Sequence, residues 1–311
     1  MKVKALASSD LSMRLSSEKG LAIKIGPYVT RMYSPVPSVA EGVHLLYADF
    51  SISDDAFADF HISVKPPASI RRWLSPQIDF YMDAMKPFKP LPLSQAFPML
   101  EWGLNWCISN YDNQHLIIHA AVIEKNGFAA ILPAPPGSGK STLCAGLVNR
   151  GWRLLSDEMT LISRRDGRIV PLPRPANLKN ASIDVMRQFA PDAVLGSEAK
   201  DTSKGTVAHM RAPSESVSRM SETAIPAWVI FPKYEAHAAA KLVASPAAEA
   251  FIFLAENAFN YSVLRREGFD LLGGVIDSSQ CYHFTYSDLD EAVETFDALH
   301  PSAAALKRRD A

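Results

Sequence analysis

A loop rich in glycine and proline lies near the middle of the chain. Residues 134–141 read APPGSGKS, after an apolar segment and before a stretch with helical spacing. They match the phosphate-binding pattern G-x-x-x-x-G-K-[ST] at every defined position except the first, which is Ala134. Glycine lets successive backbone N–H groups approach phosphate oxygens, whereas Pro135 and Pro136 have no N–H to donate. The expected nucleotide-binding residues are Gly137, Ser138, Gly139, Lys140 and Ser141, with Thr142 as a weaker candidate.

Two acidic residues, Asp157 and Glu158, follow in the next apolar segment, which we expect to lie beside the strand that leads into the loop. Lys140 would reach the β- and γ-phosphates of a nucleotide, and the Ser141 hydroxyl would bind Mg²⁺. An acidic residue here can organise Mg²⁺ or accept a proton from a substrate hydroxyl. Because side chains alternate along a strand, only one of the two faces the γ-phosphate unless the strand has ended. The predicted metal ligands are Ser141, Asp157 and Glu158.

Basic residues in two later segments could stabilise the charge that develops during phosphoryl transfer. These segments are PRPANLKN, with Arg174, Asn177 and Lys179, and KGTVAHMR, with Lys204, His209 and Arg211. We expect Arg174 and Lys179 to contact phosphate or an acceptor, and Lys204 to lie on a loop that closes over the site. The alternative is that these residues are solvated surface cations.

Strand and helix patterns alternate around these residues, which predicts an α/β core. Residues 115–134 read as two strands with a turn at Lys125-Asn126-Gly127, since Asn-Gly between apolar runs is a strong hairpin signal. Residues 94–110 read as a helix that packs on a core. Residues 191–222 are polar and read as loops with little order. The C-terminal part reads as helical over 246–279, a strand over 281–287 and a closing helix over 287–300 with Ser287 as its N-cap.

The first part of the chain has a different character. Residues 20–65 read as short strands, 42–53 among them, because Val, Ile, Tyr and Phe are interrupted by Gly, Pro and Ser. A proline-rich stretch then places a boundary near residues 85–93. We therefore expect a small β-rich unit, residues 1–92, before the α/β unit of residues 93–311.

Composition excludes several classes of protein. The chain of 311 residues is 48% hydrophobic and 21% charged, with a formal net charge of -1, which is typical of a soluble globular protein and gives no reason to expect nucleic acid or an anionic membrane as a partner. No apolar run approaches the roughly 18 residues of a membrane span, and the N-terminus lacks the apolar core of a secretory signal. The cysteines, Cys107, Cys144 and Cys281, fit small buried residues of a cytoplasmic protein better than disulfides or a zinc site.

Three segments taken together resemble the HPr kinase/phosphorylase family, most closely its subgroup of HPr-kinase-related kinase A. They are IIHAAVIEKNG with His119, the loop PGSGKST, and NRGWRLLSDE, which resembles the family's RGHRLVADD stretch. The resemblance covers about residues 95–300. It implies an α/β fold with the compact P-loop kinase core that the family shares with phosphoenolpyruvate carboxykinases, here preceded by a small N-terminal β-rich domain.

The resemblance also implies roles for individual residues. Asp157 matches the aspartate that acts as general base toward an accepting serine, and Glu158 stands where the family has a second aspartate. His119 matches a histidine that tunes this aspartate, although a hydrogen-bonded core histidine is the alternative. ATP and Mg²⁺ are the implied cofactors, and a homo-oligomer is the implied assembly. The expected catalytic residues are Asp157, His119, Lys140, Arg174 and Lys179.

The chain departs from the family in two respects. The downstream EIRG-like motif of the bifunctional members is missing from this sequence, which leaves open both the reverse phosphorylase reaction and HPr as the acceptor. The N-terminal part also does not resemble that of the HPr kinases.

The sequence thus predicts an ATP- and Mg²⁺-dependent kinase that phosphorylates a serine-like hydroxyl of a protein or peptide. A kinase for a small metabolite and a non-catalytic nucleotide-binding switch are the alternatives. Asp157 and His119 beside the loop argue against a switch, because a switch needs no base.

Overall fold

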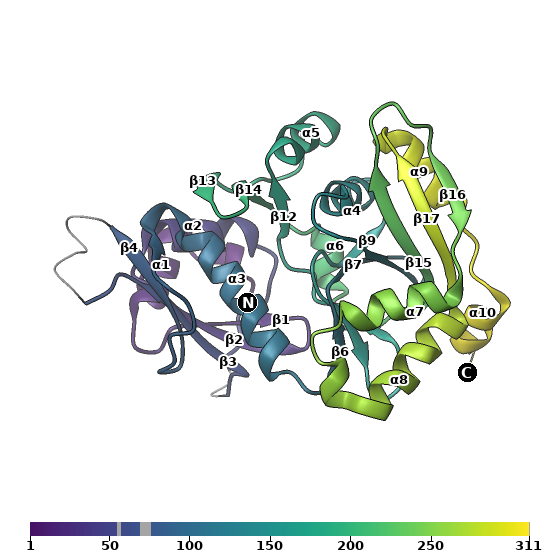
Figure 1. Ribbon diagram of the computed structural model, residues 1–311. Coiled ribbons are helices and arrows are strands. Elements are labelled where there is room, and N and C mark those ends of the chain that lie inside the picture. Colours follow the sequence, from purple (N-terminus) through teal and green to yellow (C-terminus); the bar gives the residue numbers. More distant parts are fainter. Residues whose placement is uncertain (55–56, 69–75, 311) are drawn as a thin grey trace.

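The computed structural model describes residues 1–54, 57–68 and 76–310, and of Asp310 only the backbone. Figure 1 shows two layered units side by side, the N-terminal one in purple and blue and the other in teal to yellow. Helix α3 (Ala96–Tyr111) lies along the border between them. The expected mixed α/β architecture is confirmed.

The central sheet of the second unit has the strand order β16-β17-β15-β8-β7-β9. Strands β7 and β8 form the expected hairpin, with positive φ angles of 55° at Asn126 and 86° at Gly127 in its turn. Strand β15 runs parallel to both β8 and β17, so the carboxyl ends of these strands meet at one edge of the sheet. The bounds are β7 Ala120–Lys125, β8 Phe128–Pro133, β9 Arg153–Ser156, β15 Ile225–Tyr234, β16 Lys241–Ala244 and β17 Gln280–Tyr286.

Helices cover both faces of this sheet because its strands bury residues on both sides. In β8, Ala130 and Leu132 belong to one apolar cluster with helices α4 and α9, and Ala129 and Ile131 to another with α7 and α8. A second small sheet, in the order β11-β10-β6, joins the cluster of α7 and α8. The bounds are α4 Lys140–Val148, α7 Ala247–Glu256, α8 Tyr261–Ser278, α9 Leu289–Asp297, α10 Ala303–Asp310, β6 His115–Ile118, β10 Thr160–Ser163 and β11 Ile169–Val170.

The N-terminal unit is a sheet in the order β1-β2-β3-β4-β5 with helices packed against it. One prediction here is wrong: residues 37–46 form helix α2, not a strand, since Val39, Val43 and Leu46 have the helical spacing that buries one face. The bounds are η1 Val3–Ala5, α1 Ser8–Ser16, β1 Leu21–Ile25, β2 Tyr28–Tyr33, α2 Pro37–Leu46, β3 Phe60–Lys65, β4 Gln77–Met82, β5 Leu91–Pro92 and η3 Leu93–Gln95.

A further small sheet, in the order β12-β14-β13, lies between the two units (Figure 1). The expectation of loops over 191–222 is therefore wrong. Although the segment is polar overall, Val207, Ala208 and Met210 are buried and anchor the hairpin β13–β14 to the core. The bounds are β12 Ala176–Lys179, α5 Ala181–Phe189, β13 Ala199–Thr202, β14 Gly205–Met210 and α6 Ser214–Ser218.

Two C-terminal expectations need correction. The helical segment 246–279 is divided into α7 and α8 by residues 257–260. Helix α9 is capped by Asp288, whose carboxylate accepts hydrogen bonds from the backbone N–H groups of Asp290 and Glu291, while the Ser287 hydroxyl donates to the Ala238 carbonyl.

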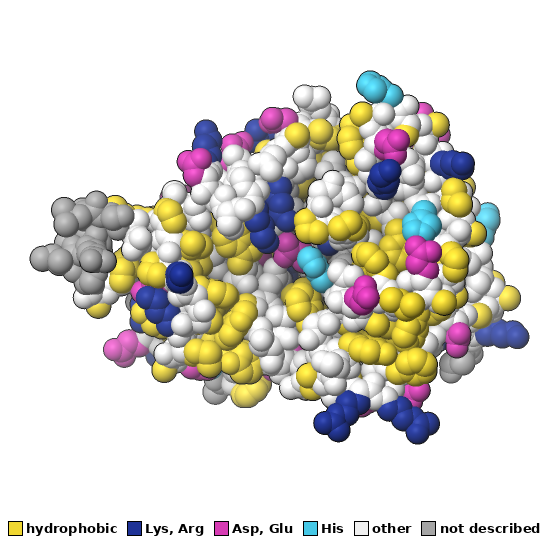
Figure 2. Space-filling model, viewed as in Figure 1, with side chains coloured by type: hydrophobic (Ala, Val, Ile, Leu, Met, Phe, Trp, Pro, Cys, Tyr) yellow, Lys and Arg dark blue, Asp and Glu magenta, His cyan; other side chains and the backbone are white. Residues whose placement is uncertain are grey.

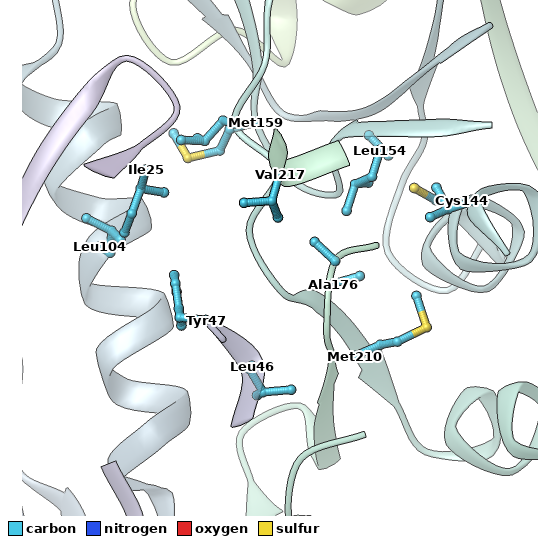
Figure 3. Close-up of a cluster of buried hydrophobic side chains, with 14 of the residues drawn as sticks. Ile25, Leu46, Tyr47, Leu104, Cys144, Leu154, Met159, Ala176, Met210 and Val217 are labelled. Atoms are coloured by element: carbon cyan, nitrogen blue, oxygen red, sulfur yellow. The ribbon is translucent and has the colours of Figure 1, made fainter. Parts of the chain in front are cut away.

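One continuous apolar cluster joins the two units. Figure 3 shows Ile25, Leu46 and Leu104 on one side and Cys144, Leu154 and Met210 on the other, with further buried side chains between them. Helix α3 contacts β3 and β4, so the helix that follows the expected boundary at residue 92 packs on the sheet before it. The boundary itself remains a prediction.

The structure also bears on the expectations for the cysteines and for membrane-spanning segments. Cys107, Cys144 and Cys281 are all free and buried, as expected. Across the described ranges, no helix has both the length and the apolar character that crossing a bilayer requires.

The close approach of α3 to the N-terminal sheet generates a test. A Cβ at Gly103 would overlap the buried ring of Phe80, so Gly103→Ala should lower the free energy of unfolding by about 1–3 kcal/mol. Gly273→Ala, in helix α8, is the matched control, because a Cβ there meets open space and should be neutral or stabilise by up to about 1 kcal/mol. Urea unfolding measures both, and equal effects would contradict the packing of α3.

Candidate functional site

The glycine loop, residues 134–139, connects strand β8 to helix α4, which begins at Lys140 as the sequence predicts. Gly137 and Gly139 both have a φ of 87°, a conformation that glycine adopts without strain. The loop is held by neighbouring strand ends, since the Tyr286 hydroxyl donates to the Gly139 carbonyl at 2.9 Å and the Tyr234 N–H donates to the Ser138 carbonyl at 2.8 Å. A Cβ at Gly139 would come within 2.6 Å of the Tyr286 hydroxyl oxygen.

A cavity of about 720 Å³ opens in front of this loop. Its size lies within the range of small-molecule sites. Helices α4 and α5 both begin at its wall, so two helix N-termini with their partial positive charge meet the same space. Figure 2 shows a hollow in the middle of the molecule, where basic, acidic and histidine side chains gather. The lining residues are His119, residues 134–142, Glu158, Asn177, residues 179–182, Ser203 and Lys204.

Lysines from separate elements converge on this cavity. Lys140 comes from the start of α4, Lys179 from the end of β12, and Lys204 from the turn between β13 and β14. Burial lowers the pKa of Lys140, and this shift is opposed by the Asp157 and Glu158 carboxylates. Such a concentration of positive charge suits a polyanionic ligand.

Of the consecutive acids, Asp157 and Glu158, only Glu158 reaches the large cavity. Strand β9 ends at Ser156, so the strict alternation of a strand no longer applies to them. Glu158 lines the large cavity, whereas Asp157 is not among its lining residues. Both line a small adjoining cavity of about 10 Å³, which has room for about one water molecule.

Hydrogen bonds fix the two carboxylates differently. The Asn177 N–H donates to Asp157 Oδ2 at 2.9 Å, while Asp157 Oδ1 is buried without a hydrogen-bond partner in the described part of the chain. Glu158 accepts from the Asn177 side-chain amide at 3.2 Å and from the Asn105 amide. Asp157 Oδ1 could therefore accept a hydrogen bond from a ligand or a water molecule.

The pKa values of the two acids are also shifted in opposite directions. Burial raises the pKa of Asp157, and the neighbouring charge of Glu158 raises it further. Burial would raise the pKa of Glu158 as well, but Lys204 and Lys179 outweigh this effect and lower it to about 2. Neighbouring titratable groups whose pKa values are pushed apart are typical of acid-base sites.

His119 lies between strands β6 and β7 and lines the large cavity. Its backbone N–H donates to the Asn257 carbonyl at 2.9 Å, and its ring lies beside Phe259, with the ring centroids 6.0 Å apart. Burial and the charge of Lys140 lower the pKa of His119 to about 4. The imidazole is therefore neutral near pH 7.

Not every expected residue faces the large cavity. Arg174 is buried in the wall of the small cavity, where Nη1 lies 3.6 Å from Glu101 Oε2 and Nη2 donates to Asn105. His209 is also buried beside the small cavity, with its ring against Phe97. The structure thus brings together the glycine loop, Glu158, His119, Lys179 and Lys204, and sets Asp157, Arg174 and His209 behind them.

Residues of helix α3 were missed by the sequence analysis. Glu101, Trp102 and Asn105 line the small cavity with the acids. The available signal was a pair of polar residues, Glu101 and Asn105, four residues apart in the apolar first three turns of the helix, which places both on one face.

Candidate metal ligands are few. Within residues 1–54, 57–68 and 76–310, no group of three or more His, Cys, Asp or Glu residues could hold a metal ion. The expected ligands are instead one hydroxyl, Ser141, and the two acids. Oxygen donors of this kind suit Mg²⁺, which usually takes few protein ligands and completes its shell with phosphate and water.

Comparison with known proteins gives one partial similarity. An HPr kinase/phosphorylase of Lactobacillus acidophilus is 33% identical to this chain over 84 residues, which are 25% of this chain and 26% of the relative. The match therefore spans about a quarter of the relative's length. No family model matches the chain.

The lowered pKa of His119 generates a pH prediction. Its folded-state pKa of about 4 lies below the ordinary 6.5, so the unfolded chain binds the extra proton first as pH falls. The contribution of neutral His119 to stability is complete above pH 6.5 and is lost progressively toward pH 4. NMR titration should show the His119 ring signal, assigned by its absence in His119→Asn, changing near pH 4. A midpoint near 6.5 would contradict the described environment.

Proposed function

We propose that this chain is a kinase that transfers the γ-phosphoryl group of ATP to a hydroxyl group, with Mg²⁺ as cofactor. The observation that carries the proposal is the shared cavity, in which the glycine loop faces Glu158 and the lysines Lys140, Lys179 and Lys204. The partial similarity to an HPr kinase/phosphorylase suggests a kinase-like function and supports the family at most. On this proposal, residues 93–311 form a P-loop kinase core of the HPr kinase/phosphoenolpyruvate carboxykinase type.

The glycine loop would hold the phosphate chain. The N–H groups of residues 137–141 would donate to its oxygens, with Thr142 in support, and the Lys140 ammonium would reach the β- and γ-phosphates. Lys179 and Lys204, which line the same cavity, would stabilise the charge on the group in transfer.

The oxygen atoms of the two acids fit Mg²⁺ as a ligand. Asp157 Oδ1 is a buried acceptor with no hydrogen-bond partner among the described residues, and Glu158, next in sequence, is ionised. Ser141 and Glu158 would hold the ion, and the Asp157 carboxylate beside them, which is also the proposed base, would add negative charge to the site. When bound, Mg²⁺ neutralises phosphate charge.

Asp157 is the proposed general base. Its Oδ2 is held by the Asn177 N–H, and its raised pKa makes Oδ1 a better proton acceptor than an exposed aspartate. As the acceptor oxygen bonds to the γ-phosphorus and the bond to the β-phosphate oxygen breaks, the hydroxyl proton would pass to Oδ1. Seen from the large cavity, Asp157 lies behind Glu158. The acceptor hydroxyl must therefore reach past Glu158, to the place where the two cavities adjoin. Neutral His119 would line the large cavity without adding positive charge beside the acids.

The proposed acceptor is a serine-like hydroxyl of a protein or peptide, and the expected setting is a cytoplasmic homo-oligomer. Incubating the pure protein and γ-labelled ATP with a lysate of its own organism tests the class of acceptor. A labelled protein band is the expected result. Label in a small molecule favours a metabolite kinase, and bound ATP whose γ-phosphate never leaves favours a nucleotide switch.

Replacement of the base should separate binding from turnover. Asp157→Asn keeps the size of the side chain and removes the proton acceptor, so we expect unchanged affinity for a fluorescent ATP analogue but a turnover at least about 10²-fold lower. Turnover that survives this change would refute the assignment of Asp157 as base.

Replacement of the loop glycine should act on binding itself. Gly139→Ala adds a Cβ 2.6 Å from the Tyr286 hydroxyl oxygen in a left-handed conformation, so affinity for the ATP analogue should fall about tenfold or more. Gly127→Ala is the matched control: its φ of 86° imposes the same backbone penalty, but a Cβ there meets no atom within 4 Å, and it lies in the distant hairpin turn. Its affinity should equal that of the unmodified protein, and equal losses in both variants would contradict a role for the loop.

A further inference from the structure

We propose that helix α3 carries positioning residues for the phosphoryl transfer, foremost Asn105, so that the N-terminal unit completes the active site. This inference rests on the proposed function and assigns a role to a helix that packs on the N-terminal sheet. One face of α3, defined by Glu101, Trp102 and Asn105, lines the small cavity beside Asp157 and Glu158.

The Asn105 amide bridges two groups of opposite charge. Its Nδ2 donates to Glu158 Oε2, and its Oδ1 accepts from Arg174 Nη2. A carboxylate can only accept and a guanidinium can only donate, so these partners dictate which end of the amide faces which group.

Glu158 is thereby held at both oxygens. Oε2 accepts from Asn105 of α3, and Oε1 accepts from the Asn177 amide of β12 at 3.2 Å. The carboxylate is therefore oriented toward the large cavity before any ligand enters. Pre-set orientation of a ligand-binding group by its outer hydrogen-bond partners is a common requirement for catalysis.

Arg174, the second partner of Asn105, contacts Glu101, which in turn contacts a residue of the N-terminal unit. Arg174 Nη1 donates to the Glu101 carbonyl at 3.4 Å and lies 3.6 Å from Glu101 Oε2. The fully buried Tyr47, just after α2, donates its hydroxyl proton to Glu101 Oε1 at 2.6 Å. A chain of polar contacts, buried at the Tyr47 end and half-buried at the other, thus runs from Tyr47 through Glu101, Arg174 and Asn105 to Glu158.

The N-terminal side also holds the hairpin that carries Lys204. The Lys204 ammonium lies over the ring of Trp102, 5.4 Å from its centroid, which is within the range of a cation–π contact. The Gln95 amide, just before α3, donates to the Asp201 carbonyl of β13 at 3.1 Å. The position of Lys204 in the cavity wall therefore also depends on this region.

Two substitutions of Asn105 test the proposal in the full-length protein. Asn105→Asp keeps the shape and the acceptor for Arg174 but removes the donor to Glu158, and Asn105→Ala removes the side chain without adding charge. The matched control is Asn110→Ala on the same helix, because the exposed Asn110 amide hydrogen-bonds to its own helix, at Trp106 and Ser109, and to no other element of the described chain. The measurements are release of labelled γ-phosphate from ATP, affinity for the fluorescent ATP analogue, and the melting temperature.

A positioning role predicts a split between turnover and binding. Both Asn105 variants should lose about 10- to 100-fold in kcat, while KM for ATP and analogue affinity stay within about twofold. Asn110→Ala should match the unmodified protein. Adding Glu158→Gln to Asn105→Asp reverses donor and acceptor in the contact, so it should recover melting temperature lost in Asn105→Asp without recovering kcat.

The outcomes that refute the inference differ from those that refute the function. Unchanged kcat in Asn105→Ala, or equal losses of kcat and nucleotide affinity, would show that Asn105 has no positioning role, although the kinase assignment stands. An unmodified protein that binds the analogue but releases no γ-phosphate overturns the proposed function and, with it, the role of Asn105.

Discussion

Burying two consecutive carboxyl groups is the physical problem around which this site is built. Two like charges in a poorly solvated wall repel each other, and each also loses its hydration. The surroundings shift the pKa values of the two acids in opposite directions. Lys204 and Lys179 keep Glu158 ionised, while Asp157, deeper in the wall, has a raised pKa. One acid is thereby suited to holding cations and the other to taking up a proton.

This inequality depends on elements far apart in the sequence. The cations arrive from the start of α4, the end of β12 and the turn between β13 and β14, and the hydrogen bonds to Glu158 arrive from α3 and β12. The glycine loop supplies only one wall. The site is therefore a product of the tertiary packing between the two units and not of the loop motif alone.

The sequence predicts best what local physics decides. The loop, the turn at Asn126 and Gly127, and the start of α4 follow from glycines at positive φ, a conformation that most other residues adopt only with strain. Helix α2 was mistaken for a strand because a short apolar run satisfies either period. The hairpin β13–β14 was missed because only part of its residues are buried.

The role of Arg174 shows the limit of such reasoning for the site. A basic residue in a proline-containing segment is compatible with a phosphate contact, but the sequence does not reveal that Glu101, 73 residues earlier, lies beside it in the folded chain. Asn105 escaped attention for the same reason, since its importance comes from partners on other elements. Residues whose role is to hold others are visible only when the fold brings their partners together.

The unbroken apolar cluster of Figure 3 has a consequence for how the molecule opens. With Leu46 and Leu104 packed into the same interior as Cys144 and Met210, neither sheet can separate from the other without wetting a shared surface. The backbone amides of both sheets should accordingly exchange their hydrogens through the same rare, global event, and a ligand that tightens around the glycine loop should slow exchange in the distant N-terminal strands as well.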